Sequence, residues 1–362
     1  MKKSLLALAV LGAFAGAASA QSSVTVYGIV DMGVTSIDTG ATAGNTTGIT
    51  SGNQSASRIG FKGTEDLGNG LKANFVLEAT IAADTGSAFS TPTAAGAGPN
   101  NGVSASAGGF NRLSTVGLSG NFGAVNLGRQ VSAIKDAYDA IDPFGDAGTI
   151  APISTMFFNG ALAGDFGRIS NSVKYSSNSF GGFKAQAAYG FGETAGDTGA
   201  GSNYGFGAGY ANGPLNVQFG YHNQDRSTAA AVQTAENKLT FLGASYNFGM
   251  FKLHGAYADT KLETFGPAAE TKYRNYLVGV SLPLGAAGNL MASYSVNDNR
   301  TTNNADAQKA AIMYTYDLSK RTNLYTGYSH TSNDNGSRIG LVAGAPVGES
   351  ASAFAVGVRH KF

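Results

Sequence analysis

The residue types that catalyse reactions or bind metal ions are scarce in this sequence. Cysteine is absent, which excludes disulfide bonds and thiolate chemistry. Four histidines are present, but they lie far apart and show no spacing that pairs them as metal ligands: His222, His254, His330 and His360. We therefore predict no catalytic residue, no metal site and no cofactor.

Glycine and charge exclude further classes of function. The run Gly205-x-Gly207-x-Gly209 is a poor match to a phosphate-binding loop, because it lies within a strand-like pattern, where glycine indicates close packing between neighbours. Charged residues make up only 13% of the chain, against about 25% in an ordinary soluble domain. The 24 basic and 23 acidic residues nearly balance, which argues against a nucleic-acid partner.

The N-terminus has the three parts of a secretory signal peptide. Lys2 and Lys3 form a basic start, residues 5–16 an apolar segment, and Ala18-Ser19-Ala20 a cleavage site of small residues. An anchor helix is the alternative, but the apolar segment is short. We expect cleavage of residues 1–20, which leaves residues 21–362 as a single domain with a net charge of −1.

Most of the mature chain alternates between apolar and polar residues, as β-strands with one apolar face do. Leu77 and Ala79, for example, alternate with Glu78 and Thr80. The same pattern recurs at residues 23–34, 183–191, 215–221, 276–284 and 354–362. After the N-terminus, no apolar run reaches the roughly 18 residues of a membrane helix, so a helical membrane bundle is excluded.

Two kinds of connection separate the strands. Seven are short and rich in turn residues: 65–70, 119–123, 177–182, 212–214, 247–249, 285–288 and 317–321. Eight are long and polar: roughly 38–55, 84–109, 130–166, 192–202, 223–237, 258–273, 297–307 and 331–350. Fifteen connections imply sixteen strands. We therefore predict an all-β fold, a 16-stranded antiparallel transmembrane β-barrel, because a soluble sandwich has no reason to sort its connections by length.

A closed barrel of this size has physical consequences. In lipid, the first and last strands must pair so that no backbone N–H or C=O is left without a partner. Sixteen strands enclose an aqueous channel rather than a packed interior. Aromatic residues at strand ends are expected at the membrane interfaces: Tyr189, Phe191, Tyr210, Tyr246, Phe248, Tyr314, Tyr316 and Phe362.

Several segments, in this order and spacing, resemble the trimeric 16-stranded general porins of Gram-negative outer membranes, in particular their beta-proteobacterial branch. They are residues 23–28 (SVTVYG), 57–71 (SRIGFKGTEDLGNGL), 116–120 (VGLSG), 127–130 (LGRQ), 242–249 (LGASYNFG), 318–322 (LSKRT) and 357–362 (GVRHKF). The resemblance spans the whole mature chain. It implies short periplasmic turns, long extracellular loops and a third long loop that folds into the barrel and narrows it.

The same resemblance implies acidic residues on that third loop, which here follows Gln130. Asp142-Pro143-Phe144-Gly145 resembles the family's Pro-x-Phe-Gly loop tip, with the acidic residue before Pro143 rather than after it. The candidate loop acids are Asp136, Asp139, Asp142 and Asp146, and Asp142 is the best single choice.

Basic residues on the barrel wall are expected to face these acids. The matching segments point to Arg58 and Arg129, and alternation places Arg58 and Lys62 on the inner face. Arg129 shares its parity with outward residues, so an inward position needs a bulge. Arg168 and Lys174 are further inward candidates, whereas Arg112 has the wrong parity and is assigned to the rim or to a subunit contact. An ordinary water-exposed wall is the alternative for all of these residues.

The sequence thus predicts a general diffusion porin that is not an enzyme and that passes ions and small hydrophilic solutes, with weak anion preference. The expected partners are two further copies of the chain, outer-membrane lipid with lipopolysaccharide, and the barrel insertion machinery, which reads Phe362. Three alternatives stay open: an outer-membrane enzyme, a surface adhesion or structural barrel, and a substrate-specific channel.

Overall fold

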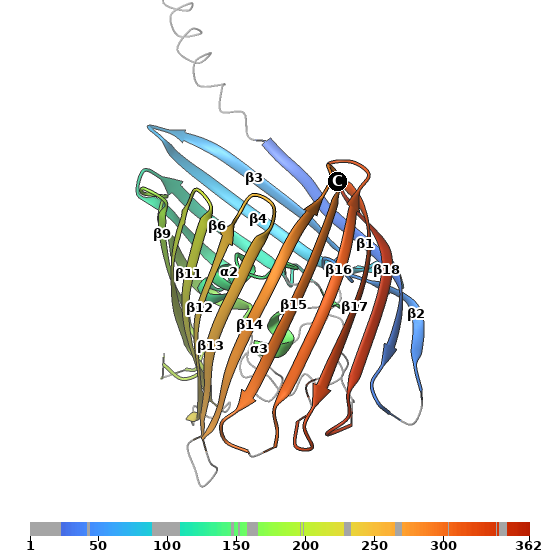
Figure 1. Ribbon diagram of the computed structural model, residues 1–362. Coiled ribbons are helices and arrows are strands. Elements are labelled where there is room, and N and C mark those ends of the chain that lie inside the picture. Colours follow the sequence, from blue (N-terminus) through green and yellow to red (C-terminus); the bar gives the residue numbers. More distant parts are fainter. Residues whose placement is uncertain are drawn as a thin grey trace, which may run out of the picture.

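The alternating segments form strands of one antiparallel sheet, which closes into a barrel (Figure 1). The computed structural model describes residues 23–41, 44–88, 109–145, 148–150, 153–157, 166–195, 197, 199–227, 233–264, 270–302, 304–337, 339 and 346–362. The strands are β1 (Ser23–Asp38), β2 (Thr46–Ser51), β3 (Arg58–Gly68), β4 (Leu71–Ala82), β5 (Ser87–Ala88), β6 (Leu113–Gly120), β7 (Gly123–Val131), β8 (Arg168–Ser176), β9 (Phe183–Gly190), β10 (Asn203–Asn212), β11 (Leu215–Ser227), β12 (Gln233–Asn247), β13 (Lys252–Thr264), β14 (Thr271–Leu284), β15 (Gly288–Asn299), β16 (Ala307–Asp317), β17 (Thr322–Asn333) and β18 (Ala351–Lys361).

These strands make a barrel of sixteen, as predicted. Both β2 and β3 pair with β1, so they are two parts of one barrel strand that is interrupted at residues 52–57. The two-residue β5 pairs only with the end of β4 at Ile81 and Ala82. All seven predicted short connections join consecutive strands, and they lie together at one end of the barrel.

The first and last strands close the barrel. β1 and β18 pair in antiparallel register from Ile29 with Lys361 to Asp38 with Ser352. Beyond them, Phe362 and Gly28 exchange backbone hydrogen bonds of 3.1 and 3.2 Å. The ring of Phe362 occupies the space beside Gly28, where an added Cβ would come within 2.4 Å of it. The C-terminal residue is therefore part of the closure.

The predicted alternation holds along the strands. On β17, Leu324 and Tyr328 are 45% and 47% exposed on the outer face, whereas Asn323 and Ser329 are buried on the inner face. The strands at the end with the long connections extend further than predicted, because β11 and β12 enter residues 223–237, and β13 and β14 enter residues 258–273. Backbone pairing there continues beyond the last apolar outward residues.

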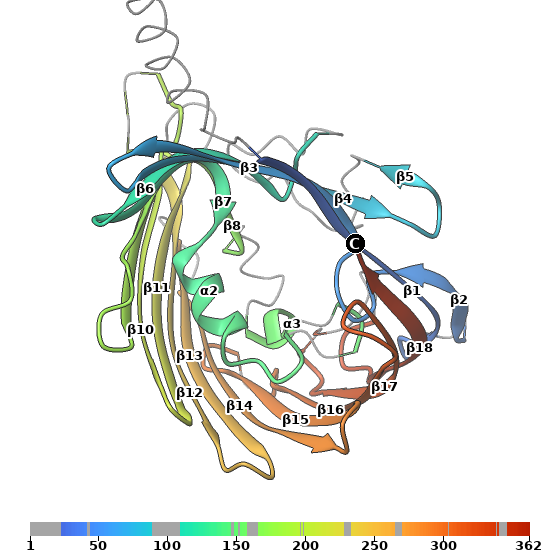
Figure 2. The ribbon, with the colours of Figure 1, turned by 90° about the horizontal axis from the view of Figure 1, so that it is seen from above.

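Residues 132–167, called the inner loop below, join β7 to β8 in the chain, and their described parts, 132–145, 148–150, 153–157 and 166–167, lie inside the barrel (Figure 2). They contain α2 (Ala133–Asp139) and α3 (Ile153–Phe157). No helix in the described residues is long and apolar enough to cross a membrane.

Glycines on the inner wall make room for this loop. An added Cβ on Gly220 or Gly243 would lie 2.9 Å from Ile134 or Ile141, respectively. On Gly279 it would lie 2.8 Å from Pro143. The absence of side chains at these wall positions thus lets the loop pack directly on β11, β12 and β14.

Candidate functional site

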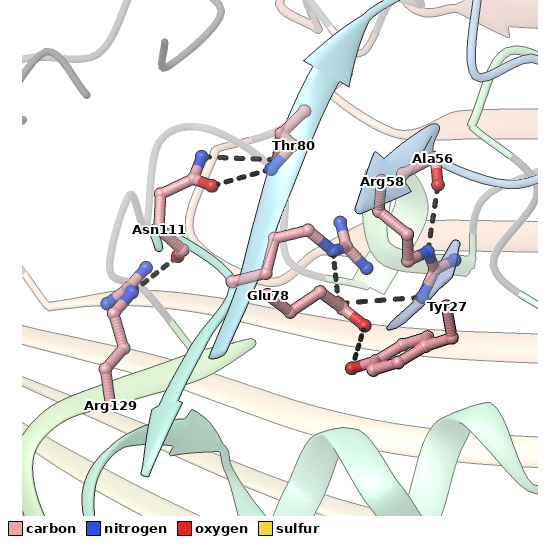
Figure 3. Close-up of polar contacts among 8 residues, drawn as sticks. Tyr27, Ala56, Arg58, Glu78, Thr80, Asn111 and Arg129 are labelled. Atoms are coloured by element: carbon pink, nitrogen blue, oxygen red, sulfur yellow. Dashed lines mark hydrogen bonds and ion pairs between the residues drawn. The ribbon is translucent and has the colours of Figure 1, made fainter. Parts of the chain in front are cut away.

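A carboxylate and two guanidinium groups form the centre of a polar cluster on the inner wall (Figure 3). Arg58 on β3 and Glu78 on β4 are brought together by the hairpin turn at Asn69 and Gly70, which pairs Arg58 with Thr80. The guanidinium of Arg58 lies 3.8 Å from the Glu78 carboxylate. The hydroxyl of Tyr27 on β1 donates a 3.0 Å hydrogen bond to the same carboxylate.

Arg112 completes this cluster, and the assignment of Arg112 to the rim or to a subunit contact is wrong. Its Nε lies 2.6 Å from Glu78 Oε1, and its side chain is only 12% exposed. Arg112 precedes β6, so the alternation of that strand does not determine its direction. Its backbone N–H instead bonds to the carbonyl of Glu78, which fixes it beside the carboxylate.

Arg129 lies at an irregularity of the kind that its parity required for an inward position. The register between β7 and β8 shifts between Gly128 and Gln130. Gly128 has φ of +116°, and a Cβ there would come within 2.1 Å of the Ser114 carbonyl oxygen, so no larger residue fits. Arg129 then donates to the Asn111 carbonyl at 2.6 Å (Figure 3) and to the Ser170 hydroxyl at 2.7 Å.

The other predicted basic residues also have inner-wall neighbours. Arg168, at the start of β8, is close enough to Arg58 to repel its positive charge, as Arg112 also does. Lys62 lies with its ammonium 5.1 Å from the centre of the Tyr27 ring. Lys174 is different, because it binds Asp136 of the inner loop at 2.5 Å and the carbonyl of Val131 at 3.0 Å.

The loop acids have unequal surroundings. Asp136 and Asp139 are partly exposed on α2, where Asp136 pairs with Lys174 and Asp139 with Lys135 at 2.9 Å. Asp142 is only 7% exposed, accepts a 3.0 Å hydrogen bond from the N–H of Phe144, and attracts Lys309 of β16.

At the loop tip, Pro143 packs on Gly279, Phe144 is buried, and Gly145 has φ of +63°. Its N–H bonds to the Asp142 carbonyl at 3.2 Å. Asp146 lies outside the described residues.

The inner loop is held at several points along the wall. The Ile141 carbonyl lies 2.6 Å from His254 Nδ1 on β13, and the Met156 carbonyl accepts a 2.9 Å hydrogen bond from Asn297 on β15. Farther along, the hydroxyl of Thr149 donates a 2.7 Å hydrogen bond to Asn53 in the interruption between β2 and β3. The loop therefore follows the wall from β8 round to the first barrel strands.

A second buried carboxylate holds residues 52–57, the interruption between β2 and β3, in place. Asp31 on β1 is fully buried and accepts hydrogen bonds from the backbone N–H groups of Gln54 at 2.7 Å and Ser55 at 2.5 Å. The hydroxyl of Tyr325 on β17 donates a third, at 2.6 Å. Because Asn53 adjoins Gln54 and bonds to Thr149, Asp31 also supports the inner loop.

Glu78, Asp31 and Tyr325 were not among the sequence candidates. Alternation does place Glu78 on the polar face of its strand. Counting outward from the turn at Asn69 and Gly70 would have put Ala79 opposite Gly60, and the register shift between Asp66 and Gly68 brings Glu78 there instead. No local signal joins Asp31 to Tyr325, which lie 294 residues apart. Among the described residues, no group of three or more histidine, aspartate or glutamate side chains could hold a metal ion.

Comparison with known proteins agrees with this arrangement. The sequence profile described as Gram-negative porin matches residues 7–336. The chain belongs to the Gram-negative porin family. It is 39% identical to outer membrane porin protein 32 of Delftia acidovorans and 34% identical to an outer membrane porin protein of Bordetella pertussis, and both alignments cover all of each chain.

Comparison with solved structures also points to the porin family. The chain is similar to a structure titled as an anion-selective porin from Comamonas acidovorans, with a TM-score of 0.80 and 33% identity over 94% of this chain and all of that one. As a member of the porin family, the chain is a channel protein of the outer membrane, as the sequence predicted.

Proposed function

We propose that the barrel is a water-filled pore for passive diffusion of ions and small hydrophilic solutes, with a weak preference for anions. The observation that carries the preference is that two guanidinium groups, those of Arg58 and Arg112, share a single carboxylate, Glu78, and that Arg168 lies near Arg58. The two positive charges of Arg58 and Arg112 against the one negative charge of Glu78 leave a positive excess on this wall. Such an excess favours anions in the adjoining water.

The loop side does not cancel that excess. Asp136 and Asp139 are each paired with a lysine, Lys174 or Lys135, so these four charges sum to zero. We propose that Asp136 and Asp139 form the acidic side of the constriction, and that Asp142 instead holds the loop tip in shape. Arg129 and Lys62 add to the basic side. The comparison structure titled as an anion-selective porin is in keeping with this proposal.

The experiment is a reversal-potential measurement in a planar bilayer under a salt gradient. Current steps with an anion-directed reversal potential are expected for the unchanged chain. The double variant Arg58→Gln/Arg129→Gln should shift the reversal potential toward cations, whereas Arg321→Gln, on the exposed turn between β16 and β17, should not. An unchanged potential in the double variant would remove both arginines from the constriction, and a silent bilayer would refute the pore itself.

We further infer that three copies of the chain associate, as the family resemblance implies. One neighbour of similar fold, OmpT of Vibrio cholerae, is described in a trimer form. Symmetric association of identical barrels is physically ordinary. Light scattering of the detergent-solubilised protein should give three times the mass of the mature chain, and a monomer mass would contradict the inference.

Contact with lipopolysaccharide is proposed for the outer face at the end of the barrel with the long connections. There, outward residues of β12 and β13 form ion pairs, with Lys238 lying 2.9 Å from both Glu236 and Glu263. Close by, Lys272 on β14 lies 2.6 Å from Glu270. Phosphate groups of lipopolysaccharide can bind such cations. Replacing Lys238 and Lys272 by glutamine should lower the lipopolysaccharide that copurifies, and an unchanged amount would refute this contact.

The export and assembly signals complete the proposal. Residues 1–20 are a signal peptide in this account, so N-terminal sequencing of the outer-membrane protein should begin at Gln21. We propose that Phe362 is read by the barrel insertion machinery in addition to closing the barrel. An intact N-terminus starting at Met1 would contradict the first statement.

A further inference from the structure

A recess of about 660 Å³ lies inside the barrel, between α2 and strands β8–β11. It is at the end with the short turns, since the turn between β8 and β9 contributes Ser177 and Ser179. The roof includes Asp136 of α2, and the wall carries the polar side chains of Lys184, Gln186, Asn216 and Gln218. None of these four wall residues was assigned a role above.

The glycine run on β10 forms the floor of the recess. Gly207 and Gly209 lack side chains, and the amides of two neighbouring strands lie over them. An added Cβ would be 3.3 Å from the side chain of Gln186 at Gly207, and 2.4 Å from that of Gln218 at Gly209. Gly209 also pairs with Lys184 on one side and with Gln218 on the other. Lys184 and Gln218 thus flank Gly209, and the Gln218 amide occupies the space that a side chain there would fill.

The charges of the recess point to a negatively charged ligand. Asp136 is already paired with Lys174. Asn216 donates to the Ala140 carbonyl at 3.0 Å and accepts from Gln218 at 2.6 Å, which fixes both side chains. In the described part of the chain, by contrast, the side chains of Lys184 and Gln186 have no hydrogen-bond or ion-pair partner. An uncommitted ammonium beside an uncommitted amide N–H is the donor set that suits an oxyanion.

We propose that this recess is a secondary binding site for a small oxyanion, a carboxylate or a phosphate, held by Lys184 and Gln186. The site rests on the proposed diffusion function, because the ligand reaches it through the pore. It lies on the side of α2 toward the short turns, away from Glu78 and its arginines. A solute leaving the constriction would meet it next, and the open side of the recess lets the ligand leave again.

The test compares currents carried by sodium chloride, sodium acetate and sodium phosphate through the purified protein in a planar bilayer. Acetate or phosphate current should saturate with concentration, whereas chloride current rises nearly in proportion. In Lys184→Gln, the concentration at half-saturation should rise by about tenfold, because a charge-assisted hydrogen bond is lost. The acetate and phosphate series separate the two kinds of oxyanion.

A matched control separates a binding site from a general effect of charge. Lys72 lies on the inner face of β4, as Glu78 does. Like the recess, it is at the end of the barrel with the short turns, but it does not line the recess. Lys72→Gln should leave saturation unchanged. Equal effects of the two variants, or linear currents of the unchanged chain in both oxyanion salts, would overturn the proposal.

Chloride conductance provides the control for folding. A variant with normal chloride steps is a folded pore, so loss of saturation then reports on the recess alone. Gln186→Leu is a second variant that keeps the charge and removes the amide, and it should also weaken saturation. Absence of chloride steps in the unchanged chain would refute the proposed pore rather than this site.

Discussion

Glu78→Gln is the sharpest test of the electrostatic argument, because it removes one charge from the centre of the arginine cluster. Glutamine keeps the size of the side chain and an oxygen that can accept from Arg112, which lies 2.6 Å from Oε1 of Glu78, and its amide N–H can donate to the hydroxyl of Tyr27, which lies 3.0 Å from Oε2. The cluster therefore keeps its packing and gains one net positive charge. Anion preference should increase.

The size of the increase follows from Coulomb's law. A unit charge about 10 Å from a permeating ion contributes about 0.4 kcal/mol in water, of which about 0.3 kcal/mol remains at 0.01 M salt. This raises the local anion concentration about 1.7-fold and lowers that of cations equally, so the anion-to-cation permeability ratio should rise about threefold. At 1 M salt, where the Debye length is about 3 Å, the change should nearly vanish.

Reversal potentials at several ionic strengths measure this ratio. Glu65→Gln is the control, because Glu65 belongs to the same hairpin but lies near its turn and has the opposite parity to Arg58. An unchanged ratio in Glu78→Gln at 0.01 M salt, or a shift toward cations, would show that this cluster does not border the path of the ions. The positive excess on the wall would then not explain the selectivity.

Two further substitutions and one deletion test other parts of the structure. Tyr325→Phe removes a 2.6 Å hydrogen bond to buried Asp31 and should cost about 1.5–3 kcal/mol, lowering the thermal midpoint, whereas Tyr328→Phe, on the exposed outer face, should not. Gly243→Val places atoms where Ile141 and Phe241 lie, so the inner loop should shift and the conductance change; conductance equal to that of the unchanged chain would show that the loop does not depend on this contact. Deletion of Phe362 removes two backbone bonds to Gly28 and should reduce the yield of assembled barrels in the outer membrane, measured on heat-unmodified gels, and a normal yield would show that the closure tolerates the loss.

The barrel itself could be predicted because strands and turns depend on residues that are close together in the sequence. Alternation depends on which face of a strand meets lipid, and turn residues mark where each hairpin reverses. The prediction was less accurate at the ends of β11 to β14 that carry the long connections, where outward residues such as Lys238 and Glu263 are charged. Hydrogen bonding between strands continues there although the apolar signal ends, so those strands were predicted too short.

The candidate site was predictable only where a residue obeys the strand period. Arg58 and Lys62 share the inner face of β3, and their positions follow from parity. Arg129 required a bulge, which the parity conflict itself indicated and which Gly128 permits. The position of Arg112 could not be predicted from parity, because Arg112 lies one residue before β6 and is positioned by the hydrogen bond from its backbone N–H to the Glu78 carbonyl.

The inward fold of the inner loop was predicted from the family resemblance, but its exact path along the wall was not. Its path is fixed by contacts between residues far apart in the chain, such as Ile141 with Gly243 and Thr149 with Asn53. Each contact needs either a glycine or a polar partner on the wall. Such a residue cannot be recognised as a loop contact from the sequence, because the position of the loop is not known. The glycines that look like weak points in strands are, in this barrel, the positions that decide where the loop lies and therefore how the pore is shaped.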